Sequence, residues 1–151
     1  MSNQPKDKNT ATQYATDLIA QGYSPEEVKD ILRNQHIATP GIKRVLSDLI
    51  DSRGLTADRL ADFVGIDPAT IFRILKGTRN PSRNILLRIA LELKLSMDET
   101  QTLLKSGNCA ALSGSRERDL VIMDGIIHSR HVDEINSELV KKRMLDLNSR
   151  G

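Results

Sequence analysis

Apolar residues recur at every third or fourth position through most of this 151-residue chain, which is the spacing that gives a helix one apolar face. Serines at 24 and 96 each stand three residues before a glutamate, the pattern of a helix N-terminus. The sequence therefore predicts an all-α fold, with helices over residues 10–21, 24–35, 39–53, 56–64, 67–76, 80–93, 96–106, 116–129 and 132–146.

The predicted helices fall into three groups between polar ends. The first ten residues lack periodic apolar positions, which predicts a disordered tail, and the last four residues form a second tail. A stretch of small and polar residues, 108–115, reads as a linker. The predicted regions are a tail at 1–10, a helical hairpin at 11–38, a compact domain at 39–107, a second hairpin at 108–147 and a tail at 148–151.

The two predicted hairpins resemble each other. The segment from Asp17 to Leu32 aligns without a gap with the segment from Asp124 to Leu139, so that acidic and aliphatic positions coincide. A helical hairpin cannot bury both apolar faces by itself, so the hairpins are expected to pack either on each other or on their copies in a second subunit. We favour the second arrangement, with the C-terminal hairpin contributing to dimerisation. A chance likeness between short amphipathic hairpins is the alternative.

The most informative stretch is residues 56–77, where two short amphipathic helices meet at a glycine. Thr56 and Asp67 are placed to cap the two helices, and Gly65 is placed to end the first one in a left-handed conformation. The apolar faces of the helices can bury each other only if the helices cross closely, which the small Ala61 permits. The side chains left outward on the second helix are Ala69, Phe72, Arg73 and Lys76.

This spacing resembles the helix-turn-helix of the Cro and phage-repressor class, the XRE family, from about Ile42 to Gly107. The matching residues are Gly54-Leu55-Thr56, Leu60-Ala61, Gly65-Ile66, Thr70-Ile71, Arg73-Ile74, Gly77-x-Arg79-x-Pro81 and the run IALELKLS at 89–96. The resemblance implies a five-helix domain that docks on double-stranded DNA as a homodimer, with its third helix in the major groove.

The resemblance also implies roles for individual residues. Base-facing positions fall on Pro68, Ala69, Phe72, Arg73 and Lys76, and DNA-backbone positions fall on Thr70, Arg79, Asn80 and Arg83. Family members often carry polar side chains where this chain has Ala57, Pro68 and Ala69. Base reading is therefore expected to depend on Arg73 pairing with guanine, and on Ala69 or Phe72 touching a thymine methyl group.

Charge favours nucleic-acid binding through its distribution rather than its sum. The chain carries 22 basic and 20 acidic residues, a net charge of only +2. From Pro68 to Leu91 there is no acidic residue, whereas this window contains the cations Arg73, Lys76, Arg79, Arg83 and Arg88. If all of these cations contacted phosphates, DNA binding would show a salt slope of about −4.5 per subunit. An ordinary solvated helix face is the alternative account.

Other chemical signals are weak. His128 and His131 lie near aspartates, but a hairpin turn separates the two histidines, and no metal site is predicted. The single Cys109 cannot form an internal disulfide, no apolar run is long enough to span a membrane, and no signal peptide opens the chain. A cytoplasmic protein without membrane contact is therefore expected. Catalytic motifs are absent, so neither enzyme activity nor a cofactor is predicted.

The sequence thus favours a DNA-binding transcriptional regulator, a repressor, that places helix 67–76 in the major groove of an operator as a homodimer. The alternative is an antitoxin-like or adaptor protein that uses Pro68, Ala69 and Phe72 to bind a protein partner. DNA affinity that falls steeply with salt would favour the regulator, and no DNA binding at low salt would favour the adaptor.

Overall fold

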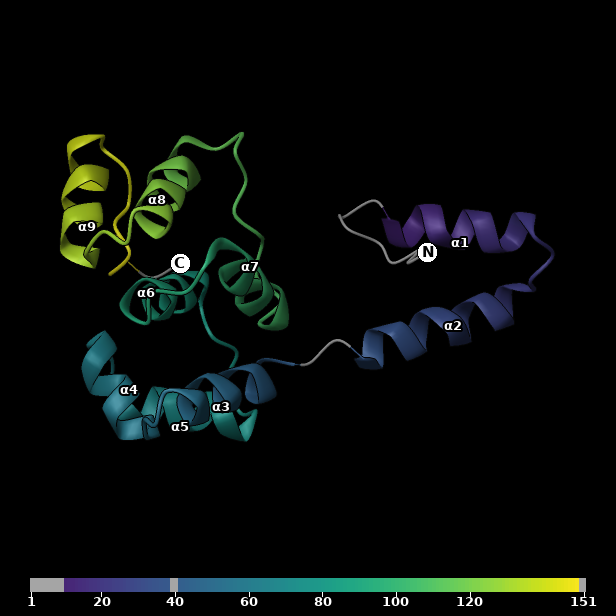
Figure 1. Ribbon diagram of the computed structural model, residues 1–151, viewed down its shortest axis with the longest axis horizontal. Helices are drawn as coiled ribbons and strands as arrows, with labels where there is room; N and C mark the ends of the chain where they lie inside the picture. The colour runs from purple at the N-terminus through teal and green to yellow at the C-terminus, as the bar shows by residue number, and fades with distance from the viewer. Residues whose placement is uncertain (1–9, 39–40, 150–151) are drawn as a thin grey trace. The chain divides into compact units, whose positions relative to one another are not determined.

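The computed structural model describes residues 10–38 and 41–149, with side chains placed at 14–32 and 41–149. Within these ranges every regular element is a helix, as the sequence predicts (Figure 1). The chain divides into two compact units, one up to Pro40 and one from Gly41. The first contains α1 (Thr10–Ala20) and α2 (Pro25–Ala38), and the second contains α3 (Ile42–Ser52), α4 (Ala57–Val64), α5 (Pro68–Lys76), α6 (Arg83–Glu92), α7 (Met97–Ser106), α8 (Glu117–Ile127) and α9 (Val132–Lys141).

Some predicted boundaries fall on residues that the structure does not describe. The predicted tail at 1–10 is outside the described residues except for Thr10, and so are the last two residues of the predicted tail at 148–151. The predicted start of a helix at Thr39–Pro40 is also outside them, and α3 begins at Ile42. None of the helices in the described ranges is both long and apolar enough to cross a membrane.

The first unit is a helical hairpin. α1 packs against α2, and Gly22, with a φ of 100°, lets the chain reverse between them. Ser24 and Glu27 form the predicted capping box, because the Glu27 N–H donates to Ser24 Oγ (3.2 Å) and the Ser24 N–H donates to Glu27 Oε1 (3.4 Å). Among the side chains described in this unit, Leu18 and Val28 are buried.

The second unit is built around α6. α3, α4 and α5 lie on one side of it, α7 lies beside it, and α8 and α9 lie on the other side (Figure 1). Because α6 contacts helices on both sides, it is apolar around most of its circumference. Its buried side chains are Asn84, Leu86, Leu87, Ile89, Ala90 and Leu91. The core that these side chains share with the neighbouring helices is aliphatic, which agrees with the low aromatic content of the sequence.

α6 begins later than the sequence predicts. The predicted start is Asn80–Pro81, whereas the first helical residue is Arg83. Ser82 has an extended backbone, and its Oγ accepts a hydrogen bond from the N–H of Ile85 (3.2 Å). A serine cap satisfies a backbone N–H at the helix start, and Pro81 is buried in the loop before it.

The predicted division between a domain at 39–107 and a C-terminal hairpin at 108–147 is not a division in the structure. Residues from Gly41 onward form one unit, and α8 and α9 both contact α6. The predicted linker at 108–115 is held in place, because the Gln101 side chain bonds both the N–H (2.8 Å) and the carbonyl (3.0 Å) of the buried Leu112. The apolar face of the C-terminal hairpin is therefore used inside its own unit.

α9 is shorter than the sequence predicts. The helix ends at Lys141 rather than near Asp146, since Arg143 takes a φ of 60°. The chain then turns back along α9, where the Asn136 side chain accepts a hydrogen bond from the N–H of Leu147 (2.8 Å). Leu147 is 1% exposed, so its burial offsets the loss of one further helical turn.

Candidate nucleic-acid interface

The turn between α4 and α5 is set by the residues that the sequence predicts. Thr56 Oγ1 accepts a hydrogen bond from a backbone N–H in the first turn of α4 (3.2 Å), and Asp67 Oδ1 accepts one from the N–H of Ala69 (2.9 Å). Gly65 ends α4 with a φ of 75°. Because a positive φ strains residues that carry a Cβ, glycine permits the sharp turn. The predicted caps are confirmed.

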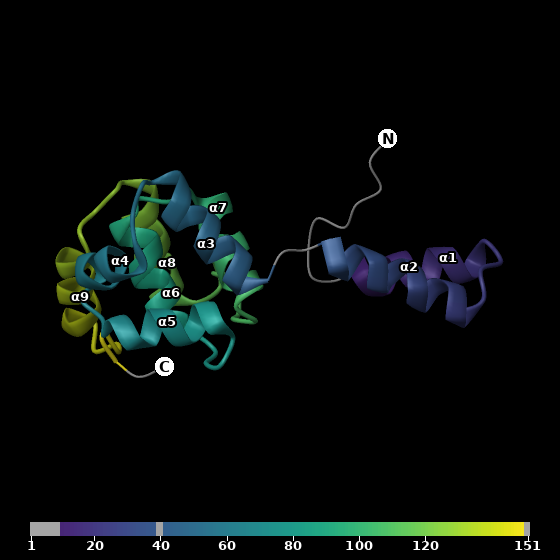
Figure 2. The same ribbon diagram turned by 90° about the horizontal axis from the view of Figure 1, so that it is seen from below.

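α5 is anchored by its inner face. Thr70, Ile71 and Ile74 are buried, and α5 packs against both α3 and α4. Ala61 of α4 is also fully buried, and its small side chain lets the two helices approach closely. Figure 2 shows α5 along the outside of the second unit, with no helix of that unit in front of it. The inner face therefore fixes the helix while its outer face stays accessible.

The outer face of α5 carries five residues that we call the outward row: Pro68, Ala69, Phe72, Arg73 and Lys76. All are exposed except Ala69, which is half-buried. The Phe72 side chain is 44% exposed, which is costly in water and suits contact with an apolar group of a partner. Arg73 and Lys76 supply two cations within one helical turn. The row thus combines charge, which attracts phosphate or base acceptors, with one apolar ring.

One protein family matches the part of the chain that contains this helix-turn-helix. Residues 46–99 match the family model described as helix-turn-helix, a span that runs from within α3 to the first turn of α7. This segment is a helix-turn-helix of the Cro and phage-repressor type. The resemblance drawn from the spacing is thereby confirmed, as is the all-α fold containing this domain. No curated protein and no solved structure matched the chain.

Arg88 links the helix-turn-helix to α6 through hydrogen bonds. This residue of α6 donates through Nη2 to the carbonyl oxygens of Val64 (2.6 Å) and Gly65 (3.1 Å). Carbonyls at a helix C-terminus lack partners within the helix, so the guanidinium satisfies them and ties α4 to α6. Arg88 lies in the window free of acidic residues, but it holds the turn and is not part of the outward row.

The loop after α5 carries two of the predicted DNA-backbone residues. Arg79 and Asn80 are both exposed, whereas Thr70 is only 7% exposed. The hydroxyl oxygen of Thr70 lies 3.5 Å from Arg79 Nη1, at the long limit of a hydrogen bond. Thr70 is thus placed to orient Arg79 from below, and it is too deep in the helix-turn-helix to present its own hydroxyl at the surface.

Arg83, also predicted to contact the DNA backbone, makes hydrogen bonds within the second unit. Its Nη1 and Nη2 donate to the two carboxylate oxygens of Asp119 in α8 (3.1 and 3.0 Å). The same guanidinium also donates to the carbonyl oxygens of Ala110 (2.8 Å) and Ala111 (3.2 Å). The side chains of Arg83 and Asp119 are 18% and 2% exposed. A guanidinium with its donors engaged in this way has little capacity left for a phosphate.

A second arginine extends this cluster to the end of the chain. Arg118 donates to the side-chain oxygen of Asn84 (2.9 Å) and to the carbonyl oxygen of Leu145 (2.8 Å), while Asn84 donates to the carbonyl of Ser149 (2.9 Å). Burial, and then the nearby charge of Arg83, lower the pKa of Arg118 from its ordinary value. The cluster fixes the C-terminal helices and tail to the start of α6, directly after the loop that carries Arg79.

The histidines at the α8–α9 turn have structural roles. His128 Nδ1 lies 3.0 Å from a carboxylate oxygen of Asp124, and His131 Nδ1 accepts a hydrogen bond from the N–H of Asp133 at the start of α9 (3.2 Å). Over the residues that the structure describes, no group of three or more histidine, cysteine, aspartate or glutamate side chains is placed to hold a metal ion.

Sequence reasoning missed two residues that shape the site. Asp119 and Arg88 both act through partners distant in the chain, with separations of 36 and 24 residues for their principal bonds. An acidic residue between apolar positions of a predicted helix was the available signal for Asp119. Arg88 gave no signal other than its charge, which made it resemble the exposed cations.

Proposed function

We propose that this protein is a transcriptional regulator that reads operator DNA with α5 in the major groove and represses by occupying its site. The observation that carries the proposal is the outward row of the helix-turn-helix. It is an exposed face on a helix held by caps and buried residues, inside a stretch without acidic side chains. Complementarity to a polyanion follows from this charge distribution. The activity proposed is binding, without catalysis.

The exposed side chains of α5 and of the loop after it suit two different roles, base reading and phosphate contact. Arg73 is our choice for direct base reading, since a guanidinium can donate two hydrogen bonds to the major-groove edge of guanine. Phe72 and Ala69 are suited to the methyl group of a thymine. Lys76, Arg79 and Asn80 would contact phosphates and fix the docking pose, with Thr70 supporting Arg79.

The structure reduces the number of cations available for DNA. Arg83 and Arg88 are engaged in internal hydrogen bonds, which leaves Arg73, Lys76 and Arg79 exposed in the window that lacks acidic residues. Of these, Lys76 and Arg79 are the two that we assign to phosphates, and two phosphate-neutralising cations correspond to a salt slope of about −1.8 per subunit. We therefore expect weaker salt dependence than the sequence alone predicts.

Arg73→Glu tests the proposal against a matched charge reversal. A duplex selected by the protein from a random pool is titrated by fluorescence anisotropy at two salt concentrations. Arg73→Glu should lower affinity by about 100-fold or more, because it removes a base contact and adds repulsion. Arg116→Glu makes the same change in charge at an exposed position next to α8, on the other side of α6 from α5, and should change affinity by less than about threefold. Equal losses in both variants would remove the outward row from the mechanism.

The second candidate is an adaptor that binds a protein through the outward row. The exposed Phe72 beside Pro68 and Ala69 favours it, because these residues form a small apolar area at the start of α5. The anisotropy titration separates the two functions. Affinity that falls with salt at the slope given above supports DNA, whereas no retention of any selected duplex at low salt supports the adaptor.

A further inference from the structure

The second unit has a cleft that lies apart from the outward row. Its walls come from three places in the chain: Phe63 near the end of α4, Leu91, Glu92 and Lys94 at the end of α6, and residues 129–132 at the turn between α8 and α9. Figure 2 shows α9 next to α4. The cleft is partly open to solvent and has a volume of about 250 Å³. Since an apolar cavity of about 150 Å³ takes up benzene, the cleft has space for one aromatic ring and a short polar chain.

One wall of this cleft is apolar. Leu91 and Val132 are 6% and 7% exposed, whereas Phe63 is 59% exposed. The core takes its residues from the other face of α4, which consists of Leu60, Ala61 and Val64. An exposed aromatic ring is unfavourable in water, and an apolar group that entered the cleft would cover it. The wall therefore suits a ligand with an aromatic or aliphatic part.

The other lining residues bring charges of both signs. Arg130 is already neutralised, because its Nε lies 3.4 Å from Asp124 Oδ2 and its Nη1 lies 3.6 Å from Glu138 Oε2. Glu92 and Lys94 differ from it. Within the residues that the structure describes, neither side chain takes part in a hydrogen bond or an ion pair, with the other or with any neighbour. The cleft thus offers one carboxylate and one ammonium whose interactions are unused.

The backbone at this cleft keeps side chains where glycine is the easier residue. Lys94 follows α6 with a φ of 53°, and Ser129 follows α8 with a φ of 51°. Helices commonly end with a glycine in this left-handed conformation, as α4 and α5 do at Gly65 and Gly77. A residue with a Cβ is strained there, and strained residues cluster at ligand sites. Lysine at this position favours a use for its ammonium beyond ending the helix.

We propose that the cleft binds a free α-amino acid with an aromatic or large aliphatic side chain. Such a molecule carries an ammonium and a carboxylate on the same carbon atom, so it can pair with Glu92 and Lys94 together. Its side chain would lie against Phe63. A ligand with one charge would satisfy only one of the two protein charges, and a purely apolar ligand would satisfy neither.

The position of the cleft connects this site to the helix-turn-helix. An occupant would contact α4 and the turn between α8 and α9 together, and α4 packs against α5. Binding of the amino acid and binding of DNA would then be coupled, each changing the affinity for the other by the same factor. That consequence rests on the proposed function, whereas binding of the amino acid is measured on the free protein.

An amide NMR titration of the full chain with L-phenylalanine tests the site. Two probes share its ring, of which 3-phenylpropanoate lacks the ammonium and 2-phenylethylamine lacks the carboxylate. L-Phenylalanine should shift the amides of Phe63 and of residues 91–94 and 129–132, with a dissociation constant of about 1 mM or lower. Each probe should bind at least about 10-fold more weakly. No saturable shift up to about 20 mM L-phenylalanine, or equal affinity for a probe that lacks one charge, would overturn the proposal.

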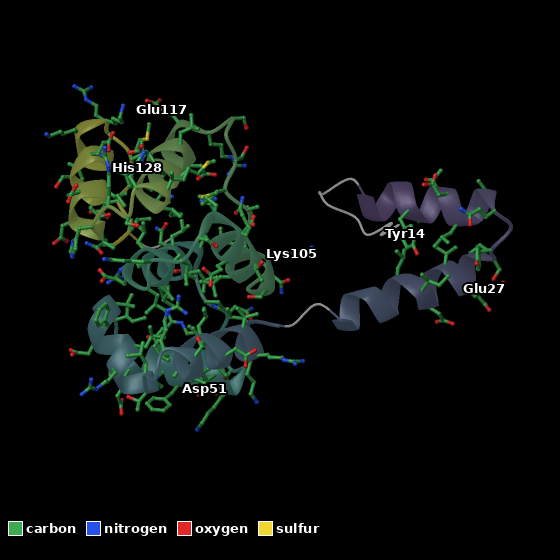
Figure 3. The ribbon with its side chains drawn as sticks, in the orientation of Figure 1. Tyr14, Glu27, Asp51, Lys105, Glu117 and His128 are labelled. Carbon is green, nitrogen blue, oxygen red and sulfur yellow. The ribbon has the colours of Figure 1, made fainter. Side chains whose placement is uncertain are left out.

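Lys94→Gln and Glu92→Gln assign the two charges. Each should raise the dissociation constant for L-phenylalanine by about 10-fold. Lys94→Gln should leave the affinity for 2-phenylethylamine unchanged, and Glu92→Gln should leave that for 3-phenylpropanoate unchanged. Lys105→Gln is the matched control. Lys105 is an exposed residue of α7 that points away from α6 (Figure 3), so this variant should change the affinity by less than about twofold.

Unchanged affinity for L-phenylalanine in either cleft variant would also overturn the proposal. Amide positions outside the cleft report whether a variant is folded, and the comparison of the three probes on the unmodified chain needs no variant at all. Every one of these measurements is made without DNA. A negative result would therefore leave the proposed function of α5 standing.

Discussion

Ile126 in the C-terminal hairpin is 7% exposed, whereas Ile19, at the aligned position of the N-terminal hairpin, is 54% exposed. The two hairpins have first helices of equal length and matching turn bonds. Local sequence therefore sets the construction of each hairpin, but it does not decide where the hairpin packs. That decision depends on a few residues that face the rest of the chain.

Asp119 is the clearest of these residues. It is 1% exposed, it accepts two of the hydrogen bonds that the Arg83 guanidinium donates, and it also accepts one from the N–H of Ser113 (2.9 Å). The N-terminal hairpin has an uncharged threonine, Thr12, at the aligned position. A hydrophobic face packs against other apolar surfaces with little selectivity, whereas a buried charged residue packs only where a partner of opposite charge is present. We therefore interpret the Arg83–Asp119 ion pair as the contact that determines which hairpin docks on α6.

Asp119→Ala should lower the free energy of unfolding more than any other substitution that tests the difference between the hairpins. Removing the carboxylate leaves the mostly buried charge of Arg83 without its partner, which is expected to cost about 3–5 kcal/mol of unfolding free energy. Urea unfolding followed by circular dichroism measures the change. Glu134→Ala removes an exposed carboxylate from α9 and should cost less than about 0.5 kcal/mol. Similar small costs for both would mean that apolar contacts suffice to dock the hairpin.

Gly125→Ala should have the next largest effect. A Cβ at residue 125 would collide with the Cδ1 and Cγ1 atoms of Ile135, whose side chain is 1% exposed, so we expect a cost of about 1–3 kcal/mol despite the better helix propensity of alanine. At the positions aligned with Gly125 and Ile135, the first unit has Leu18 and the smaller Val28, and both are buried. Shortening the facing side chain by Ile135→Val should therefore reduce the cost of Gly125→Ala.

A double-mutant cycle measures this coupling. The free energies of unfolding of the two single variants and the double variant are compared by urea titration, and a favourable coupling is expected for residues in direct contact. Strictly additive costs would show that the collision is relieved elsewhere. In that case the exchange of large and small residues between the hairpins would not account for their different packing.

The parts of the fold that were predictable from sequence are those determined within one or two helical turns. Thr56, Gly65 and Asp67 fixed the α4–α5 turn, and Ser96 with Glu99 forms the predicted capping box of α7. Each bond joins residues close in the chain, so spacing alone identifies it. The outward row followed in the same way, from the helical period.

What could not be predicted depends on residues distant in the chain. Arg83, Arg88 and Arg79 look alike in the sequence, but the first two donate to acceptors 36 and 24 residues away and only Arg79 is exposed. The linker at 108–115 reads as loose because Gln101, which holds it, lies in α7. Periodicity reports which face of a helix is apolar, and carries no information on which helix will cover it.

Exchanging the turn residues should have the smallest effect. Ser129 has a φ of 51° and Gly22 a φ of 100°, so the same turn is made by a strained residue in one hairpin and an unstrained one in the other. Ser129→Gly should stabilise the second unit by about 0.5 kcal/mol, since relief of strain exceeds the added entropy of the unfolded chain. Gly22→Ser should destabilise the first unit by about 1 kcal/mol. Hydrogen exchange resolves the two units separately.

Ser129→Ala distinguishes backbone strain from the loss of the serine side chain. Alanine removes the hydroxyl but keeps the Cβ, so the φ of 51° remains strained and no gain in protection of α8 and α9 is expected. A gain as large as that of Ser129→Gly would contradict the strain account. If only glycine stabilises, the turn is held in its conformation by the packing on either side of it. Ile126 in the C-terminal hairpin is 7% exposed, whereas Ile19 at the aligned position of the N-terminal hairpin is 54% exposed, a difference that is consistent with glycine at the N-terminal turn.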